Sequence, residues 1–195
     1  MNKNSKIYKN IHKLIKDRNY TIISENKLKN NDIIFTIKNN ISIYIIDINN
    51  KDINLNELRR ISKLKYTNDI KTLIIIANKV KINITLMKYI NTLDFILQLL
   101  DFDLIQRDPI THILVPKHEL LSKQQKDTLL NKSNIKLKDI PKIYINDPIA
   151  KWYGGNIGDI FKITRIVSSY MNISTMNEIT YRVVINPILI NDGLI

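Results

Sequence analysis

Apolar residues near the start of the chain recur at helical spacing. Ile7, Ile11 and Leu14 share one stripe, and Lys9 and Lys13 lie off it, which predicts that the chain opens with an amphipathic helix. The pattern then changes to two runs rich in β-branched residues, 33–38 and 41–47, on either side of two asparagines, Asn39 and Asn40. Because asparagine tolerates positive φ, these runs are predicted to form a hairpin with a two-residue turn.

The rest of the first hundred residues alternates helix-like and strand-like patterns. The predicted elements are a helix capped by Asn56 and running through Leu58, Ile61 and Leu64, a buried strand Leu73–Ala77, a helix near Thr85–Thr92, and a second apolar run, Phe95–Leu100. Strands interleaved with helices predict an α/β first domain over residues 1–108.

The pattern changes at Asp108-Pro109. Because proline disfavours helix at the residue before it, the chain is predicted to extend through Ile110–Pro116. Ser122 opens Ser-Lys-Gln-Gln, a capping-box pattern that predicts a helix to about Lys132.

Short elements complete a small α+β domain over residues 109–195. They are an extended piece Lys142–Ile145 after Pro141, a short helix capped by Asp147 with Pro148 in its first turn and ended by Gly154-Gly155, and strands Ile160–Val167 and Thr180–Ile185 joined by a polar loop, Ser168–Asn177.

Composition excludes several classes of protein. The chain has 195 residues, of which 44% are hydrophobic and 25% charged, so one ordinary domain or two small ones are expected. No apolar run reaches the roughly 18 residues that span a bilayer, and Met1–Lys16 carries lysine throughout, unlike a secretory signal. Cysteine is absent, which excludes disulfides, thiolate chemistry and cysteine zinc sites.

The net charge of +12 favours a polyanionic partner, since lysines near phosphates release condensed counterions. The larger share of the excess precedes His112, so the first domain is the better candidate for nucleic-acid contact. An alternative explanation is codon drift in an AT-rich genome, because the chain has 24 Lys against 6 Arg, 41 Ile against 5 Val, and 25 Asn.

Candidate metal and nucleotide sites are weak. His12, His112 and His118 are the three histidines, and none has a nearby carboxylate pair, so we expect no metal site. The glycines between Gly154 and Gly158 follow a predicted helix instead of leading into one, which favours a turn over a phosphate loop. His118 is interpreted as structural, with its ring bonded to the backbone where the strand turns into the next helix. We expect no catalytic residue and no cofactor.

A metal-dependent nuclease is the enzyme hypothesis that stays open. Restriction-endonuclease-like cores place an acidic residue and an (Asp/Glu)-x-Lys tripeptide on one sheet to hold a divalent metal. Asp47-Ile48-Asn49 has asparagine in the lysine position, and Glu25-Asn26-Lys27 fits the tripeptide but precedes the hairpin. The sequence therefore favours a nuclease-like fold without the chemistry.

The six arginines stand out in a chain that otherwise prefers lysine. Arg165 and Arg182 are two of them, and a retained arginine indicates a need for planar, bidentate hydrogen bonding to a partner or to an internal carboxylate.

Ordered motifs over residues 112–186 resemble the subunit called H of archaeal RNA polymerase and the fifth subunit shared by the three eukaryotic nuclear polymerases, which form one family. The chain reads His112-Ile-Leu-Val-Pro-Lys-His118, Leu121-Ser122, Ile140-Pro141-Lys142-Ile143, Asp147-Pro148-Ile149, Gly158-Asp159-Ile160-Phe161-Lys162-Ile163-Thr164-Arg165 and Tyr181-Arg182. The positions carried over as polymerase-docking or family-motif residues are His112, Val115, Pro116, Lys117, His118, Ser122, Pro141, Asp147, Pro148, Gly158, Arg165, Tyr181 and Arg182.

This resemblance implies a non-catalytic subunit of a DNA-directed RNA polymerase. Residues 109–195 would be an assembly domain that docks on the largest subunit, and residues 1–108 a restriction-endonuclease-like, non-catalytic jaw beside downstream double-stranded DNA. Departures are the turn Gly154–Gly158, the long loop 168–178, and the absence of a proline near Asn83, where the jaw turn would face DNA.

Compartment and source follow from the same resemblance. The chain would act in the nucleus if it is cellular, and in a viral cytoplasmic factory or a virion if it comes from a large DNA virus. The extreme use of isoleucine, asparagine and lysine favours the virus over an AT-rich protist. A free-standing DNA-binding protein is the remaining alternative.

Overall fold

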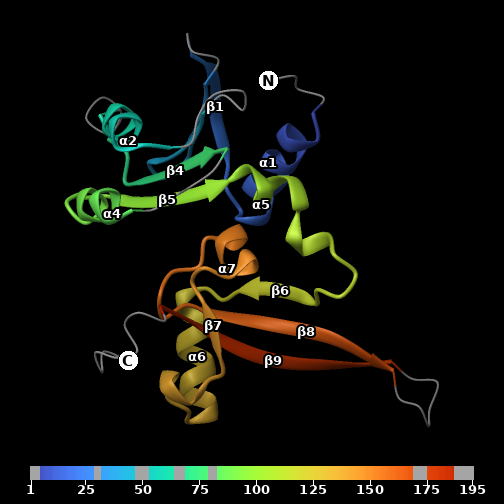
Figure 1. Cartoon of the computed structure of the whole chain (residues 1–195). Coiled ribbons are helices and arrows are strands. Elements are labelled where there is room, and N and C mark those ends of the chain that lie inside the picture. The colour runs from blue at the N-terminus through green and yellow to red at the C-terminus, as the bar shows by residue number, and fades with distance from the viewer. Residues whose placement is uncertain are drawn as a thin grey trace. The chain divides into compact units, whose positions relative to one another are not determined.

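The computed structural model describes residues 5–28, 32–46, 53–63, 69–78, 83–168 and 175–186 (Figure 1). The chain divides into two compact units, Met1–Arg107 and Asp108–Ile195. Each unit has a sheet of its own that mixes parallel and antiparallel strands.

The first unit has a five-stranded sheet in the order β1-β2-β3-β4-β5. Its strands are β1 Ile22–Lys27, β2 Ile33–Ile37, β3 Ile41–Ile45, β4 Thr72–Ala77 and β5 Ile96–Asp101. The strands from β1 to β3 run antiparallel to one another, whereas β4 and β5 continue parallel to β3. The predicted hairpin is confirmed: Asn39 and Asn40 have φ of 68° and 61°, and Ile37 pairs with Ile41.

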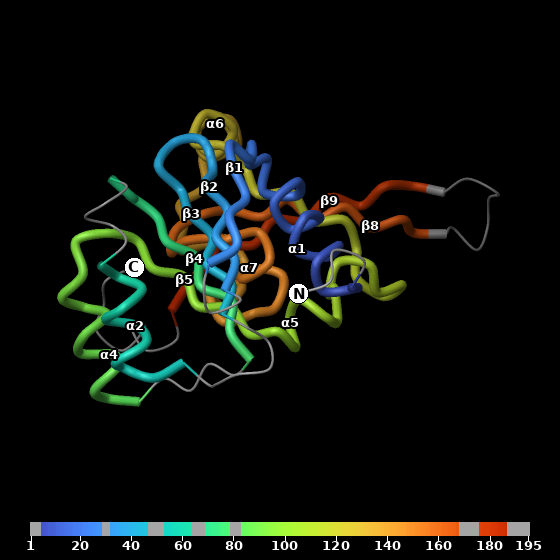
Figure 2. The backbone as a smooth tube through the Cα atoms, turned by 90° about the horizontal axis from the view of Figure 1, so that it is seen from above, coloured from blue at the N-terminus to red at the C-terminus, as the bar shows by residue number. Residues whose placement is uncertain are grey.

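Helices cover both faces of this sheet. They are α1 Lys6–Asp17, α2 Leu55–Ser62, α4 Ile84–Ile90 and α5 Phe102–Arg107. Figure 2 shows α2 and α4 on one side of the strands and α1 and α5 on the other. The predicted stripe of α1 is confirmed, since Ile11 and Leu14 are fully buried.

Side chains of successive strand residues point to opposite faces of the sheet, so each face has its own core. Tyr44, Ile75 and Leu58 belong to the cluster beneath α2 and α4, and neighbouring residues such as Ile43 and Ile74, also fully buried, point to the opposite face. Strands buried on both faces read as continuous apolar runs, which explains why β4 was predictable.

One detail of the first unit was predicted wrongly. Asn54, not Asn56, caps α2, because the Asn54 side chain accepts a hydrogen bond from the Glu57 N–H at 2.9 Å. Leu64 and Asp47 lie outside the described residues. The sequence also did not predict β1 or α5: β1 is largely exposed, and α5 is a six-residue helix directly after β5.

The second unit has a four-stranded sheet in the order β6-β8-β9-β7. Its elements are β6 Lys117–Leu120, α6 Lys123–Ser133, β7 Lys142–Tyr144, α7 Pro148–Tyr153, β8 Ile160–Ser168, β9 Thr175–Ile185 and two 3-10 turns, η1 Pro109–Thr111 and η2 Leu137–Asp139. Helices α6 and α7 lie on opposite faces of this sheet (Figure 1).

Both predicted caps of the second unit are confirmed. The Ser122 Oγ accepts from the Gln125 N–H at 3.3 Å, and the Gln125 side chain accepts from the Ser122 N–H at 2.9 Å. The Asp147 carboxylate accepts from the Ile149 N–H at 2.8 Å, and α7 ends at Gly154 with φ of 69°.

Two expectations for the second unit are wrong. Ile110–Pro116 is not extended, because Pro109 opens η1 and the chain then turns; proline suits the first turn of a helix, where its missing N–H costs nothing. The expected loop Ser168–Asn177 is shorter, since β9 begins at Thr175 and pairs with the end of β8.

Within the described part of the chain, every helix is too short or too polar to span a bilayer.

Candidate functional site

A tight turn begins the motif region of the second unit. The Val115 N–H donates to the His112 carbonyl at 2.8 Å, and the Leu114 N–H donates to the His112 Nδ1 at 3.2 Å. His112 therefore holds the turn from both its backbone and its ring. The two residues at the tip, Ile113 and Leu114, are 94% and 82% exposed.

His118 bonds to the backbone at the beginning of β6, whereas the sequence interpretation placed this bond at the end of the strand. Its Nδ1 lies 2.7 Å from the Pro116 carbonyl oxygen; because a carbonyl only accepts, this nitrogen carries the proton. The ring packs edge-on against Phe161, with centroids 6.2 Å apart. Burial lowers the pKa of His118, and the Pro116 carbonyl opposes this shift.

Strand register divides the motif residues between the two faces of the sheet. His118 pairs with Ile163 and Arg182 pairs with Phe161, so His118, Arg165 and Arg182 share one face. Asp147, Arg182 and Arg165 all act electrostatically on His118, which places these charges near one another. Tyr181 lies on the opposite face, so Tyr181 and Arg182 do not present one surface.

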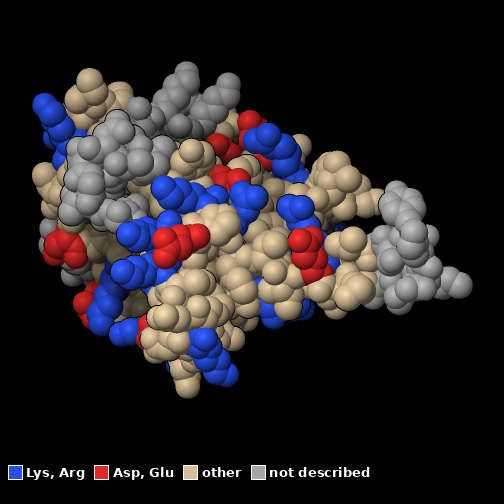
Figure 3. Space-filling model, turned by 90° about the horizontal axis from the view of Figure 1, so that it is seen from below, with Lys and Arg blue, Asp and Glu red and all other residues tan. Residues whose placement is uncertain are grey.

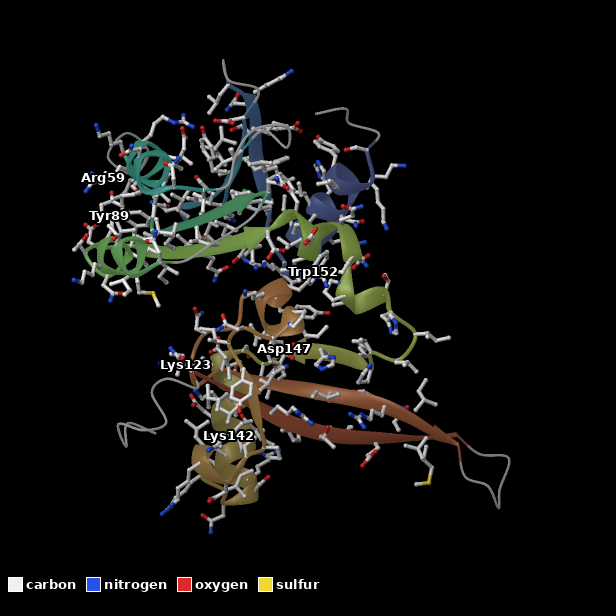
Figure 4. All side chains as sticks on the ribbon, viewed as in Figure 1. Arg59, Tyr89, Lys123, Lys142, Asp147 and Trp152 are labelled. Carbon is white, nitrogen blue, oxygen red and sulfur yellow. The ribbon has the colours of Figure 1, made fainter. Side chains whose placement is uncertain are left out.

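Helix α7 covers part of the face that carries His118. Ala150 packs with Phe161, Ile163 and Val184 in one core cluster, and Trp152 is fully buried. Figure 4 labels Trp152 on α7 and Asp147 just before it. Asp147 caps this helix and Pro148 is its first residue, so both motif positions orient α7.

The opposite face of the sheet carries a row of charged side chains on β6 and β8. Glu119 accepts from the Lys117 ammonium at 2.7 Å and lies 3.8 Å from that of Lys162. The hydrogen bond from Lys117 lowers the pKa of Glu119. Tyr181 is partly buried and packs against the cluster of Ile160 and Val183, as do leucines of α6.

Arg165 and Arg182 have few partners. The Arg182 Nη1 donates to the Lys142 carbonyl at 3.4 Å, and both arginines are exposed. Arg165 faces Glu178 across β8 and β9, but within the described residues no ion pair joins the two side chains. The prediction that a retained arginine contacts a partner or an internal carboxylate therefore stays untested.

Glycine and proline positions hold the sheet ends together. Gly158 has φ of +85°, its N–H donates to the Val184 carbonyl at 2.8 Å, and its own carbonyl accepts from the Lys126 ammonium at 2.7 Å. The Pro141 carbonyl accepts from the Val183 N–H at 2.8 Å. These bonds fasten α6 and β7 to β9, which is a scaffold role.

A groove of about 900 Å³ lies beside β6 and β8. Val115, Pro116 and Lys117 of the motif line this groove. The remaining lining residues are Ile113, Leu114, Glu119, Lys162, Thr164, Arg165, Ile166 and Asn177. The sequence pattern gave no indication of this groove.

In the described segments, no cluster of three or more histidine, aspartate or glutamate side chains is arranged to bind a metal. Glu25, from the tripeptide considered for a nuclease, accepts a hydrogen bond from the Tyr8 hydroxyl at 2.7 Å. His12 packs against Tyr8 and Phe35 in an aromatic cluster.

One buried polar group of the first unit was missed by the sequence interpretation. Asp32, 2% exposed, accepts from the Tyr44 hydroxyl at 2.5 Å and from Arg60 at 3.0 Å. Burial and the bond to Asp32 raise the pKa of Tyr44 to about 12. Arg60, one of six arginines, was the available signal.

Comparison with known proteins identifies the second unit. Residues 108–184 match the family described as RNA polymerase Rpb5, C-terminal domain. The chain is 40% identical over 78 residues to DNA-directed RNA polymerase subunit Rpo5 of Methanocaldococcus jannaschii, covering 40% of this chain and 94% of that subunit.

Two further relatives agree. The Rpo5 subunit of Archaeoglobus fulgidus is 43% identical over 74 residues, which are 38% of this chain and 91% of the relative. Subunit 5B of DNA-directed RNA polymerases IV and V of Arabidopsis thaliana is 36% identical over 73 residues, 37% of this chain and 31% of the relative. The chain thus belongs to the family of DNA-directed RNA polymerase subunits that includes archaeal Rpo5 and eukaryotic Rpb5.

Proposed function

We propose that this chain is a non-catalytic subunit of a multisubunit DNA-directed RNA polymerase, with residues 109–195 as the assembly domain that docks on the largest subunit. One observation carries the proposal: nearly the whole length of an archaeal subunit, 94%, aligns with 40% of this chain, and the family match spans 108–184. The second unit alone therefore corresponds to a complete polymerase subunit.

Arg165 and Arg182 are the motif residues best placed to contact a partner, because both are exposed and share a face of the sheet. Arg182→Glu should reduce co-purification with the largest subunit by about tenfold, as expected for a lost charged hydrogen bond. Lys123→Glu is the control, since a negative charge suits the beginning of α6. Unchanged incorporation of Arg182→Glu would contradict its role in docking.

Residues 1–108 are proposed to form a jaw near downstream DNA. The net charge of +12 supports this role, and so do the exposed basic residues Arg59 on α2 and Lys88 on α4. The Arg59 guanidinium lies over the Tyr89 ring, 5.6 Å from its centroid, and Figure 4 labels both residues. On the face drawn in Figure 3, basic and acidic side chains are interspersed, and no concentrated basic patch is seen there.

Removing residues 1–108 should weaken DNA engagement by the assembled polymerase and reduce its dependence on salt, while incorporation of the subunit is preserved. Equal DNA affinity at each salt concentration with and without these residues would argue against a jaw that contacts DNA.

The jaw is further proposed to be restriction-endonuclease-like in fold and inactive as a nuclease. Its antiparallel hairpin beside parallel strands is compatible with such a core, and the buried Asp32 is bound to Arg60. The rival, a metal-dependent nuclease, predicts magnesium-dependent DNA cleavage by the pure protein. A free-standing DNA-binding protein predicts tight binding by the isolated chain.

The compartment follows from this role. The chain would act in the nucleus if it is cellular, or in a viral factory or virion if a large DNA virus encodes it. The bias of 41 Ile against 5 Val supports an AT-rich genome. Fractionation of native material for the chain and for polymerase activity tests this assignment.

A further inference from the structure

The turn that begins at His112 has two apolar residues at its tip, and hydrogen bonds to His112 hold the turn. Turn tips usually carry Gly, Asn, Asp or Pro, yet Ile113 and Leu114 occupy this one and are 94% and 82% exposed. Two hydrogen bonds to His112 fix the turn. The turn therefore presents the two aliphatic side chains to solvent.

The edge of β8 beside this turn lacks a partner strand among the described residues. β6 pairs with β8 only from Phe161 to Thr164, although β8 continues to Ser168. The Leu121 N–H donates to the Ile160 carbonyl, and main-chain groups facing one edge recur every second residue. The N–H and C=O of Ile166 therefore point to the same edge, past the end of β6, and no described strand pairs with them there.

Aliphatic side chains flank this free edge. Ile166 is 74% exposed, and Ile179, on the same face of β9, is 48% exposed. Ile113, Leu114 and Ile166 line the groove beside β6 and β8. An unpaired strand edge next to exposed apolar surface is a template on which a strand of another chain can pair.

The charge of the groove indicates what that chain carries. Lys117, Lys162 and Arg165 line it, against one carboxylate, Glu119, which pairs with both lysines. Arg165 has no ion pair within the described residues. An occupant with an acidic side chain would complement this excess of positive charge.

We infer that the groove beside β6 and β8 is a β-augmentation site, at which an extended, aliphatic and acidic segment of another polymerase subunit pairs with the free edge at Ile166. A helix does not fit this role, because its main-chain groups bond to one another and leave none for the N–H and C=O of Ile166. Aliphatic residues at alternate positions would pack on Ile113, Leu114 and Ile166. The inference rests on the proposed function and adds the mode of docking.

Three variants of the full chain test this mode in co-expression with the two large polymerase subunits. Ile166→Pro removes the free N–H at an edge position that tolerates proline, whereas Ile166→Thr keeps it and shortens the side chain. The double variant Ile113→Ser, Leu114→Ser removes the apolar tip. Ile157→Ser is the matched control, because Ile157 is 44% exposed and does not line the groove. Thermal unfolding of each variant checks that it folds.

The inference predicts that Ile166→Pro and the double variant lower recovery with the large subunits by about tenfold, with a smaller loss for Ile166→Thr and no loss for Ile157→Ser. Equal recovery of wild type, Ile166→Pro and the double variant would overturn the mode of docking and leave the proposed function intact. Failure of the wild type to co-purify would overturn the proposed function and this inference with it.

A photocrosslinking residue in place of Ile113 identifies the occupant. A crosslink to an aliphatic and acidic segment of a polymerase subunit supports the inference. Crosslinks to nucleic acid, or to another part of this chain, would overturn it.

Discussion

The His118 ring is half-buried between the Pro116 carbonyl and the Phe161 ring, so its protonation is coupled to folding. Burial lowers its pKa in the folded state, and the unfolded chain therefore binds the proton more tightly. The contribution of His118 to stability is complete above the ordinary histidine value of about 6.5. It is lost as the pH falls below that value toward the lower folded pKa.

His118→Gln should remove this part of the acid sensitivity. Denaturant unfolding of wild type and variant between about pH 8 and pH 5 measures it: the free energy of unfolding should fall less steeply for the variant. Parallel slopes for wild type and His118→Gln would show that the ring does not titrate with folding.

Arg60 and Arg59 are adjacent on α2 but have different contacts. Arg60 bonds to the buried Asp32 and to Glu57, whereas Arg59 lies over Tyr89. Arg60→Ala should lower the free energy of unfolding by about 1–2 kcal/mol, a value discounted because the arginine is 44% exposed. Arg59→Ala should cost about 0.5 kcal/mol or less. Equal losses in denaturant titrations would show that Asp32 does not depend on Arg60.

At the scale of elements, α6 depends on its cap. Its exposed residues bury little surface, so the reciprocal bonds between Ser122 and Gln125 are a large part of what defines its beginning. Ser122→Ala should destabilise the protein by about 1 kcal/mol, measured by thermal unfolding. Ser133→Ala, at the other end of α6, removes the same hydroxyl group from a serine that does not cap the helix. It should have no comparable effect.

Elements with local signals were predictable from the sequence. The Asn39-Asn40 hairpin, the Ser122 capping box and the helix from Asp147 to Gly154 each depend on residues within a few positions of one another. β1 and η1 were not, because β1 is defined by its pairing with β2 and η1 follows a residue, Asp108, with φ of 50°. Pairing and local strain are decided by tertiary structure.

At the scale of the whole molecule, the family was predictable and the candidate surface was not. The ordered motifs from His112 to Arg182 sufficed for the family because each one maintains a turn, cap or strand of the second unit. The groove depends on β6 ending before β8 does. This fact is not encoded locally, since it follows from the register of β6 on β8.

Incorporation into a polymerase is the central claim, and a pull-down of the tagged full-length chain from its native extract tests it most directly. We predict that the two large polymerase subunits are recovered with the chain in amounts comparable to its own. Recovery of the chain without them would contradict the account.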